Sequence, residues 1–325
     1  PMQLEKDGEM TQFRENLEEV STEHNSPPKV AIIIVNWNGY ALTKACLKSL
    51  KELRYSNFQT VLVDNGSVDG SGERLKSEFP EIELLTSPDN IGFTGGNNLG
   101  IQWALDHSYD QVLLLNNDTL VEPDFLDPLV SFLEQNPDYG AVQPKIMFEA
   151  ERNKLWNAGG GYFKGLEMTW SIGLGQLDEG QFDQEKDTHW ITGCAILVRS
   201  AVIRQVGMLD NRFFAYYEDV EWSFRIKKSG FRLRYLPQSK IYHVAGGSSK
   251  KIKTKEGVIP PILHYYRTRN HLFLIRSHSN PVSFVLSLLY QTLKNAAFIL
   301  YLGLKGRFQK VNAILKGHYE GLFSK

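Results

Sequence analysis

The stretch from residue 29 to 116 alternates continuous apolar runs with segments of helical spacing. The apolar runs, each expected to be a strand, are 29–35, 60–64, 82–86 and 111–116. The helical segments between them are 41–53, 71–79 and 94–106. Because uninterrupted β-branched runs are typical of strands buried on both faces, this alternation predicts an α/β fold with a doubly wound, mostly parallel sheet.

Polar residues follow three of these strands at the point where each strand ends. They are residues 36–38, Asp64 and residues 116–118. Ligands of open α/β sheets bind beyond the carboxyl ends of the strands. Turn chemistry explains some of these residues. Amides or carboxylates at three strand ends of one sheet nevertheless favour a binding edge.

Two nucleotide-binding classes lack their motifs here. The chain contains no GxxxxGK[ST] sequence, which argues against an ATPase-type phosphate loop. The loop after the first strand has a single glycine, Gly39, so the dinucleotide fingerprint is absent where it belongs. The glycine-rich segment 92–100 lies far from that strand. A hydride-transferring enzyme is therefore disfavoured.

The segment LLLNNDT contains the candidate metal ligand, Asp118. A carboxylate at the end of a buried strand suits Mg²⁺ or Mn²⁺, which prefer oxygen ligands. Asn116 offers only a neutral carbonyl. The alternative is that Asp118 caps the following turn. His243, which follows the apolar segment at 240–242, is expected to be a metal ligand only if Asp118 lies close to it, and otherwise a structural residue.

Two adjacent acids, Glu218 and Asp219, follow the aromatic run FFAYY and open a predicted helix, 218–230. Apolar surroundings raise the pKa of a carboxyl, which suits a general base. Neighbouring residues of a helix do not share a face, so we expect one acid to point into the site and the other to serve as N-terminal charge. The alternative is that both only cap the helix.

The second half of the chain is less regular. Residues 159–161 and 171–188 are predicted loops, and 189–207 is a predicted strand followed by a short helix. Residues 231–237 and 240–244 are predicted as two strands. The glycine- and lysine-rich segment that follows, with Lys250 and Lys251, could wrap a diphosphate with backbone N–H groups and ammonium charge, or be a solvated loop.

The carboxyl-terminal region is basic. From Ser248 onward there are 13 Lys/Arg and two acids, a net charge of +11, which leaves −12 for residues 1–247. We expect it to face something anionic, and the candidates are a phosphate, a membrane surface, a nucleic acid or the acidic body itself. Residues 264–278 are a predicted basic helix, and 281–306 is the most hydrophobic segment.

The segment 281–306 is long enough to span a bilayer, but its polar residues line one helical face. They are Ser283, Ser287, Gln291, Lys294 and Asn295. This pattern favours an amphipathic helix on a membrane surface, so residues 264–306 are the predicted membrane contact. A core or homodimer contact and a membrane span are the alternatives.

These observations predict three parts. Residues 1–28 form a polar, acidic extension without the apolar stretch of a leader. Residues 29–257 form the main domain, with a nucleotide-binding half at 29–130 and an acceptor and catalytic half at 131–257. Residues 258–325 form the helical, amphipathic extension. Two cysteines and no CxxC motif indicate a reducing compartment, so we expect a cytoplasmic protein at the inner face of the membrane.

As an ordered set, the motifs resemble those of family-2 glycosyltransferases. They are VAIIIVNWNGY, VLVDNGSVDG, DNIGFTGGNNLGI, LLLNNDT, GCAILVRS and FFAYYEDVEWSFR. More narrowly, the chain looks like bacterial rhamnosyltransferase-like members of polysaccharide biosynthesis. The resemblance covers roughly residues 29–250. It implies a GT-A fold, a dTDP- or UDP-sugar donor, a divalent metal (Mg²⁺ or Mn²⁺) and inversion at the anomeric carbon.

The resemblance also implies roles for particular residues. Asp219, in the family's ED motif with Glu218, matches the catalytic base, and Asp118 and His243 match metal ligands. The implied donor-site residues are Val35, Asn36, Trp37, Asn38, Asp64, Asn90, Gly92, Asn97, Asn117, Trp190, Thr192, Gly193 and Lys250. One position departs from the family, since Asn116 replaces the first aspartate of the DxD motif. Metal binding is therefore expected to rest on Asp118, His243 and the donor phosphates.

The expected activity is transfer of a sugar, rhamnose by preference, to a hydroxyl of a glycan or polyprenyl-diphosphate-linked glycan. No nucleic-acid readout motif is present. A non-catalytic sugar-nucleotide-binding subunit is one alternative, and the intact ED pair argues against it. A nucleotidyltransferase is the other, but it usually needs a basic glycine-rich loop after the first strand, and NWNGY is neither.

Overall fold

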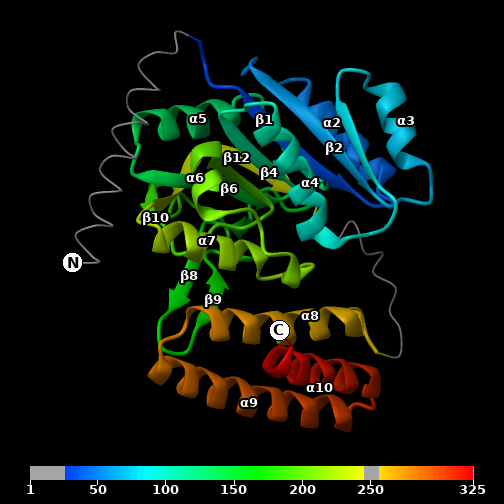
Figure 1. Ribbon diagram of the computed structural model, residues 1–325, viewed down its shortest axis with the longest axis vertical. Coiled ribbons are helices and arrows are strands. Elements are labelled where there is room, and N and C mark those ends of the chain that lie inside the picture. The colour runs from blue at the N-terminus through cyan, green and yellow to red at the C-terminus, as the bar shows by residue number, and fades with distance from the viewer. Residues whose placement is uncertain (1–25, 245–255, 325) are drawn as a thin grey trace.

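The computed structural model describes residues 26–244 and 256–324. The predicted diphosphate-wrapping lysines, Lys250 and Lys251, lie outside the described residues. Figure 1 shows a sheet with helices on both faces and a separate layer of three helices beneath it.

The first half of the sheet confirms the predicted parallel topology. Its strands run in the order β4-β1-β2-β3, and neighbouring strands are parallel. They are β1 (Val30–Asn36), β2 (Phe58–Asn65), β3 (Glu83–Ser87) and β4 (Gln111–Leu115). The helices of this half are α2 (Tyr40–Leu50), α3 (Ser71–Glu78) and α4 (Gly92–Asp106). Because the four strands are parallel, their carboxyl ends meet at one edge of the sheet, as the sequence predicted.

The second half of the sheet is mixed. In the order β10-β12-β6-β11-β4, strand β11 is antiparallel to both β4 and β6, whereas β6 and β12 are parallel. The strands are β5 (Thr119–Val121), β6 (Tyr139–Phe148), β7 (Leu155–Asn157), β10 (Lys186–Asp187), β11 (Ala195–Arg199) and β12 (Arg232–His243). The helices are α5 (Leu126–Gln135), α6 (Ser200–Val206), η1 (Asn211–Phe213) and α7 (Glu218–Lys228).

Two sequence predictions are wrong in this half. Part of the predicted loops is strand, because β8 (Gly160–Phe163) pairs with β9 (Met168–Ser171) in a small separate sheet and β10 adds to the main one. The two strands predicted at 231–237 and 240–244 are one strand, β12. Its register shifts between Leu236 and Lys240, around Pro237, which has no N–H to donate.

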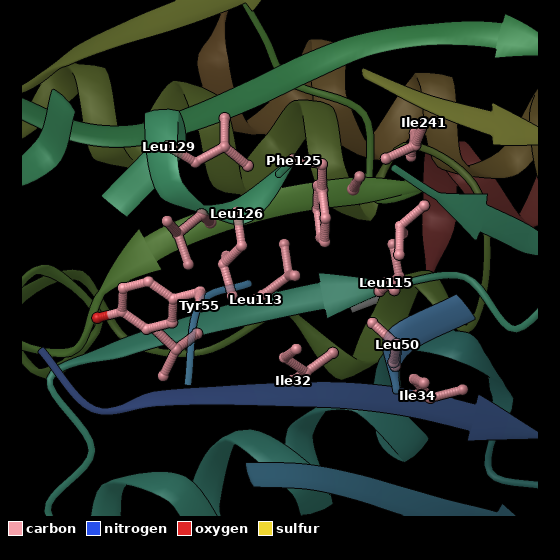
Figure 2. Close-up of a cluster of buried hydrophobic side chains, with 14 of the residues drawn as sticks. Ile32, Ile34, Leu50, Tyr55, Leu113, Leu115, Phe125, Leu126, Leu129 and Ile241 are labelled. Atoms are coloured by element: carbon pink, nitrogen blue, oxygen red, sulfur yellow. The ribbon is translucent and has the colours of Figure 1, made fainter. Parts of the chain in front are cut away.

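Alternate residues of β1 supply two cores. Ile32 and Ile34 pack with residues of α2 and α5 on one face, in the cluster drawn in Figure 2. Ala31 and Ile33 belong to the cluster on the opposite face, with residues of α4, α6 and α7. Side chains of a strand alternate between faces, so a strand apolar at every position must be covered on both sides. With both faces of the sheet covered, the polar residues that follow β1, β2 and β4 lie at the carboxyl ends of these strands.

The three C-terminal helices form the lower layer in Figure 1. They are α8 (Pro261–His278), α9 (Pro281–Leu304) and α10 (Phe308–Phe323). Helix α10 lies close against α8, since a Cβ on Gly317 would be 2.6 Å from the carbonyl oxygen of Tyr265. The β8–β9 hairpin reaches this layer, where the Glu167 carbonyl bonds His271 Nε2 at 2.8 Å.

The hydrophobic helix α9 turns its polar stripe toward the protein. Ser283, Ser287, Gln291 and Asn295 are buried. The predicted fifth member of the stripe, Lys294, is exposed. Large apolar side chains face outward instead: Val282, Val285, Leu286, Leu289, Leu293, Phe298, Leu300, Tyr301 and Leu304. A core role for this helix is therefore excluded, since 22% of its apolar window is buried.

Candidate functional site

The ends of β1 and β2 are joined by the amide of Asn36. Asn36 pairs with Asp64 in the strand register, and its Nδ2 donates to Asp64 Oδ1 at 3.1 Å and to Ser71 Oγ at 2.7 Å. Its Oδ1 accepts a bond of 2.8 Å from Thr43 Oγ1. The side chain is fully buried. Asn36 therefore serves the predicted site by orienting Asp64.

Asp64 lies at a point of very close approach. A Cβ on Gly72, in the first turn of α3, would overlap the Asp64 carboxylate, so only glycine fits there. Ser67 Oγ also donates to Asp64 Oδ1. The carboxylate is buried at the carboxyl end of β2, and Trp37, which follows its register partner Asn36, is 52% exposed. An exposed indole next to an oriented carboxylate suits a planar polar ligand such as a nucleoside base.

The neighbouring loops are tied by Asn38, which has the left-handed φ of 49°. Its Oδ1 accepts a 2.9 Å bond from the Val68 amide, and its own amide donates to Ser67 Oγ at 3.0 Å. Val35 lies behind this loop, where a Cβ on Gly96 would be 2.8 Å from its Cγ1. These contacts fix the loop after β1 against the loop after β2.

The start of α4 forms a second wall of the site. Asn90 Oδ1 accepts bonds from the Gly92 amide at 2.9 Å and from Asn65 Nδ2 at 3.2 Å. Gly92 has φ 81°, and a Cβ there would meet the carbonyl of Phe214 at 2.5 Å. Asn97 is buried and donates to the Phe93 carbonyl at 2.8 Å. These side-chain bonds, with the close approach at Gly92, hold the backbone of this wall in place.

Asp118 and His243 lie side by side. Strand β5 pairs with β12 so that Thr119 faces His243, and Asp118 Oδ1 lies 3.0 Å from His243 Nε2. Both side chains are buried, and the edge of Trp156 packs on the imidazole at 4.4 Å between centroids. His243 was expected to be a candidate metal ligand only if Asp118 lay close to it, and the two side chains are in contact.

The donor set at Asp118 fits a divalent cation that shares its shell with a substrate. It offers one carboxylate and one imidazole, and within the described residues no group of three or more His, Cys, Asp or Glu could hold a metal. Asn116 and Asn117 follow β4 beside it, and Asn117 Nδ2 donates to Thr43 Oγ1 at 2.9 Å. Further ligands must come from water, an amide or donor phosphates, as Mg²⁺ sites commonly arrange.

Both acids of the ED pair are buried at the start of α7. Asp219 Oδ2 accepts a 2.8 Å bond from the Gly193 amide, and its Oδ1 accepts one from the Val220 amide. Burial raises the pKa of Asp219. Burial, with the Asp219 charge as a second cause, raises the pKa of Glu218 well above its usual range.

This environment disagrees with the prediction that one acid serves as N-terminal charge, because burial favours the neutral form of Glu218. Glu218 Oε2 is buried and finds no hydrogen-bond partner among the described residues. A buried carboxyl without partners favours its neutral form. Glu218 therefore favours its neutral form, whereas the backbone N–H bonds to Asp219 favour the charged form of that carboxylate. Neighbouring carboxyls with shifted pKa values are more typical of functional sites than of helix caps.

The segment 190–193 connects the base to the rest of the site. Gly193 donates to Asp219 while a Cβ on it would lie 3.2 Å from the ring of Phe93, in α4. Trp190 and Thr192 are buried, and Trp190 Nε1 donates to the Gly161 carbonyl at 3.0 Å. The two halves of the chain thus meet at Gly193.

Several residues of the site went unpredicted. They are Thr43, Ser67, Ser71 and Gly72 around Asp64, and Asn270 and His271 of α8. The hydroxyls gave no signal beyond ordinary turn composition. For α8 a signal existed, because the stretch RTRNHLF places two polar residues, Asn270 and His271, directly before an apolar run. Both prove to be buried.

Comparison with known proteins gives a consistent family. The family model described as "Glycosyl transferase family 2" matches residues 31–207. The "dTDP-rhamnosyl transferase RfbF" of Shigella flexneri is 23% identical over 250 residues, covering 75% of this chain and 81% of that protein. The "N-acetylglucosaminyl-diphospho-decaprenol L-rhamnosyltransferase" of Mycobacterium tuberculosis is 28% identical over 200 residues. That match covers 56% of this chain and 65% of the relative, a little under two thirds of its length.

Solved structures show the same fold at low identity. A mannosyltransferase from Pyrobaculum calidifontis, in complex with GDP-Man and Mn²⁺, matches with TM-score 0.53 and 14% identity. It covers 98% of this chain and 96% of that chain. S. aureus TarS 1–349 in complex with UDP-GlcNAc matches with TM-score 0.58 and 15% identity, covering 90% of this chain and 81% of that one. These likenesses establish a GT-A fold.

Proposed function

The chain belongs to glycosyl transferase family 2, and we propose that it transfers rhamnose from a dTDP- or UDP-linked donor to a glycan hydroxyl, with inversion. The observation that carries this proposal is the buried Asp219, held by the Gly193 amide at the junction of the two halves of the chain. Sugar transfer as such follows from the family. The sugar, the base and the acceptor are the parts we propose.

The proposed donor lies along the edge formed by β1, β2 and α4. Asp64, oriented by Asn36, accepts from the imide edge of a pyrimidine, and the exposed Trp37 covers its face. Uracil and thymine both present an in-plane N3–H donor to such a carboxylate, so Asp64 suits either pyrimidine. The name of the Shigella relative supports a dTDP-linked sugar.

Asp118 and His243 are the proposed protein ligands of a divalent cation, Mg²⁺ or Mn²⁺. When bound, such an ion offsets the negative charge that builds on the leaving diphosphate. Asn116 and Asn117, beside Asp118, are proposed to orient the donor phosphates. Because the protein supplies a single carboxylate, we propose that the cation and the donor bind together.

Asp219 is the proposed general base. Its raised pKa makes it a stronger proton acceptor than an exposed aspartate. It takes the proton of the acceptor hydroxyl while the hydroxyl oxygen bonds to the anomeric carbon. The bond from that carbon to the diphosphate oxygen breaks on the opposite face, and both electrons leave with the diphosphate. One displacement with one base inverts the configuration.

The acceptor is proposed to be a glycan on a lipid diphosphate at the inner face of the cell membrane. The name of the mycobacterial relative supports this class of acceptor. The outward apolar face of α9 supports a membrane surface next to the enzyme. A span is less consistent, because α9 packs with α8 and α10, and α10 bears Lys316, which is 67% exposed. A second copy of the chain is the alternative occupant of the α9 face.

The predicted contact through residues 264–306 changes in one respect. Two cations of α8 are held by the protein, since Arg269 donates to the Arg212 carbonyl at 2.9 Å and Arg276 to the Ser324 carbonyl at 2.7 Å. A third, Arg267, is exposed and lies over the ring of Tyr216. Residues 268 and 270–275 are buried. The proposed membrane face is therefore the outer side of α9, with α8 as its support.

A thermal-shift panel of dTDP- and UDP-sugars, each with and without Mn²⁺, tests the donor proposal on wild type and Asp118→Ala. A ligand at ~100 times its Kd adds about 2.7 kcal/mol of stability, so the donor should raise Tm by several degrees. We expect one pyrimidine-linked donor to do so, with a Mn²⁺-dependent gain that Asp118→Ala loses. GDP-mannose is the matched purine control. Stabilisation by GDP-mannose alone, or by no donor, would refute the proposal.

A further inference from the structure

The segment that leads into the catalytic helix has an unusual backbone. Phe214, Tyr216 and Tyr217 all have positive φ, at 52°, 71° and 71°. Residues with side chains disfavour this region, and three of them in four positions persist only where surrounding contacts hold them. Glu218 and Asp219 follow directly. Whatever holds this segment therefore also sets where the proposed base begins.

Helix α8 supplies those contacts through one side chain. Asn270 is fully buried, and its Nδ2 lies 2.8 Å from the Phe213 carbonyl, 2.8 Å from that of Ala215 and 2.7 Å from that of Tyr216. An amide has two hydrogens, so the three carbonyls share them. These carbonyls belong to the residues that flank Phe214 and to Tyr216 itself.

The amide of Asn270 is itself oriented by its neighbour. Arg269 Nε donates to Asn270 Oδ1 at 2.9 Å, which fixes the Nδ2 group on the side of the loop. The same guanidinium donates to the Arg212 carbonyl at 2.9 Å. Two rings add to the contact, because Tyr266 stacks on Phe214 at 5.1 Å and His271 stacks on Tyr217 at 5.1 Å.

The held segment touches both parts of the proposed site. The Phe214 carbonyl accepts a 3.1 Å bond from the Thr94 amide, beside the close approach at Gly92. At its other end, Tyr217 is the residue that precedes α7 and the ED pair. A shift of this segment would move the α4 wall and Asp219 relative to each other.

We propose that Asn270 is a positioning residue for the transfer reaction, which holds the 213–217 segment so that Asp219 meets the acceptor hydroxyl. This inference rests on the proposed function of Asp219. It makes helix α8, which lies outside the residues that the family model matches, a working part of the active site.

The test compares Asn270→Ala with Thr268→Val. Thr268 is buried on the same helix, but it lies against Gly317 of α10. Hydrogen exchange on the ligand-free protein should show amides 214–220 exchanging at least tenfold faster in Asn270→Ala and unchanged in Thr268→Val. With dTDP-rhamnose and N-acetylglucosaminyl-diphospho-polyprenol as probes, kcat should fall about 10- to 100-fold, more than the donor KM rises.

Arg269→Lys keeps the test decisive if Asn270→Ala does not fold. Arg269 is only partly buried, and lysine retains its charge but lacks the planar fork that reaches Asn270 Oδ1 and the Arg212 carbonyl together. We expect amides 214–220 to exchange faster than in wild type and kcat to fall more than the donor KM rises, both to a smaller extent than in Asn270→Ala. Unchanged loop exchange and a kcat within twofold of wild type, in whichever variant folds, would overturn the proposal.

Failure of this inference differs from failure of the proposed function. If Asp219→Asn abolishes transfer while Asn270→Ala and Arg269→Lys transfer normally, the base assignment stands and Asn270 has only a structural role. If Asp219→Asn transfers normally, the proposed base itself is wrong.

Discussion

Two carboxyl groups next to each other in the chain share one buried environment at the start of α7. Glu218 has no partner for Oε2 among the described residues, whereas Asp219 accepts two backbone N–H bonds. The environment therefore favours the neutral form of Glu218 more strongly than that of Asp219. Unequal carboxyls of this kind allow one to act as a base while its neighbour stays protonated.

The raised pKa of Glu218 has a consequence for stability. A carboxyl with a raised pKa in the folded state stabilises the fold fully below its ordinary pKa of about 4, and this contribution is lost as the pH rises through the raised value. We expect Glu218→Gln to be more stable than wild type at pH 8, by about 1–2 kcal/mol. The difference should shrink as the pH falls toward 4.

Denaturant unfolding across this pH range measures the difference. Glu179→Gln, an exposed acid changed in the same way, is the control and should match wild type throughout. A difference for Glu218→Gln that does not change with pH would show that Glu218 is not held in a raised-pKa environment.

Individual site residues were predictable where a side chain with metal-binding or acid–base chemistry directly borders an apolar strand segment in the sequence. Asp118 and His243 are 125 positions apart, yet a carboxylate and an imidazole that each border an apolar strand segment were expected to matter if they met. Asn36 shows the limit. The sequence marks it as polar at a strand end, but its burial depends on Ser71 and Thr43, which arrive from two different helices.

Among the elements, α9 departs most from an ordinary surface helix. Its polar stripe has partners in the protein: Ser287 Oγ donates to the Gly165 carbonyl at 3.2 Å, and Asn295 Nδ2 lies 3.2 Å from His318 Nδ1. The amphipathic pattern was visible in the sequence. Which side faces the protein was not, because it depends on the β8–β9 hairpin and α10.

Substitution of the outer face of α9 tests the membrane proposal. Leu289 and Leu293 are 57% and 62% exposed, so Leu289→Glu with Leu293→Glu should leave the fold intact. Each buried leucine contributes about 1.5–3 kcal/mol, so binding to phosphatidylethanolamine–phosphatidylglycerol vesicles should fall at least tenfold. Val68→Glu, an exposed apolar residue of the sheet domain, is the matched control.

Cosedimentation with vesicles and the oligomeric state in solution should be measured together. Loss of vesicle binding in the α9 double variant, with Val68→Glu unaffected, is the expected result. Wild-type protein that ignores vesicles and forms dimers which the double variant disrupts would contradict the membrane proposal and favour a second copy of the chain.

At the scale of the whole molecule, the site depends on three separate regions. The nucleotide edge comes from residues 36–97, the metal ligands from β5 and β12, and the base from α7 with α8 behind it. Gly193 joins the base to the nucleotide edge, because its amide bonds Asp219 and a Cβ on it would lie 3.2 Å from the ring of Phe93. A single change at this junction should affect donor and acceptor together.

The first half of the fold was predictable because its strands alternate with local helices, and β1, β2 and β3 pair in the order in which they follow along the chain. The second half was not, since β6 lies between β11 and β12 and pairs with residues that are far away in the chain, such as Leu197 opposite Val142 and Arg232 opposite Tyr139. Such pairings leave no local periodicity. For this part the family resemblance implied the GT-A fold but no strand order.

Transfer by wild type and Asp219→Asn is the measurement that tests the account most directly. It uses the donor that stabilises wild type, a polyprenyl-diphosphate-linked N-acetylglucosamine acceptor, and Asp106→Asn, an exposed aspartate, as control. We predict that kcat of Asp219→Asn falls about 10²- to 10⁴-fold while the donor still raises its Tm. Asp106→Asn should match wild type. An Asp219→Asn enzyme that transfers sugar within a few-fold of wild type would contradict the account.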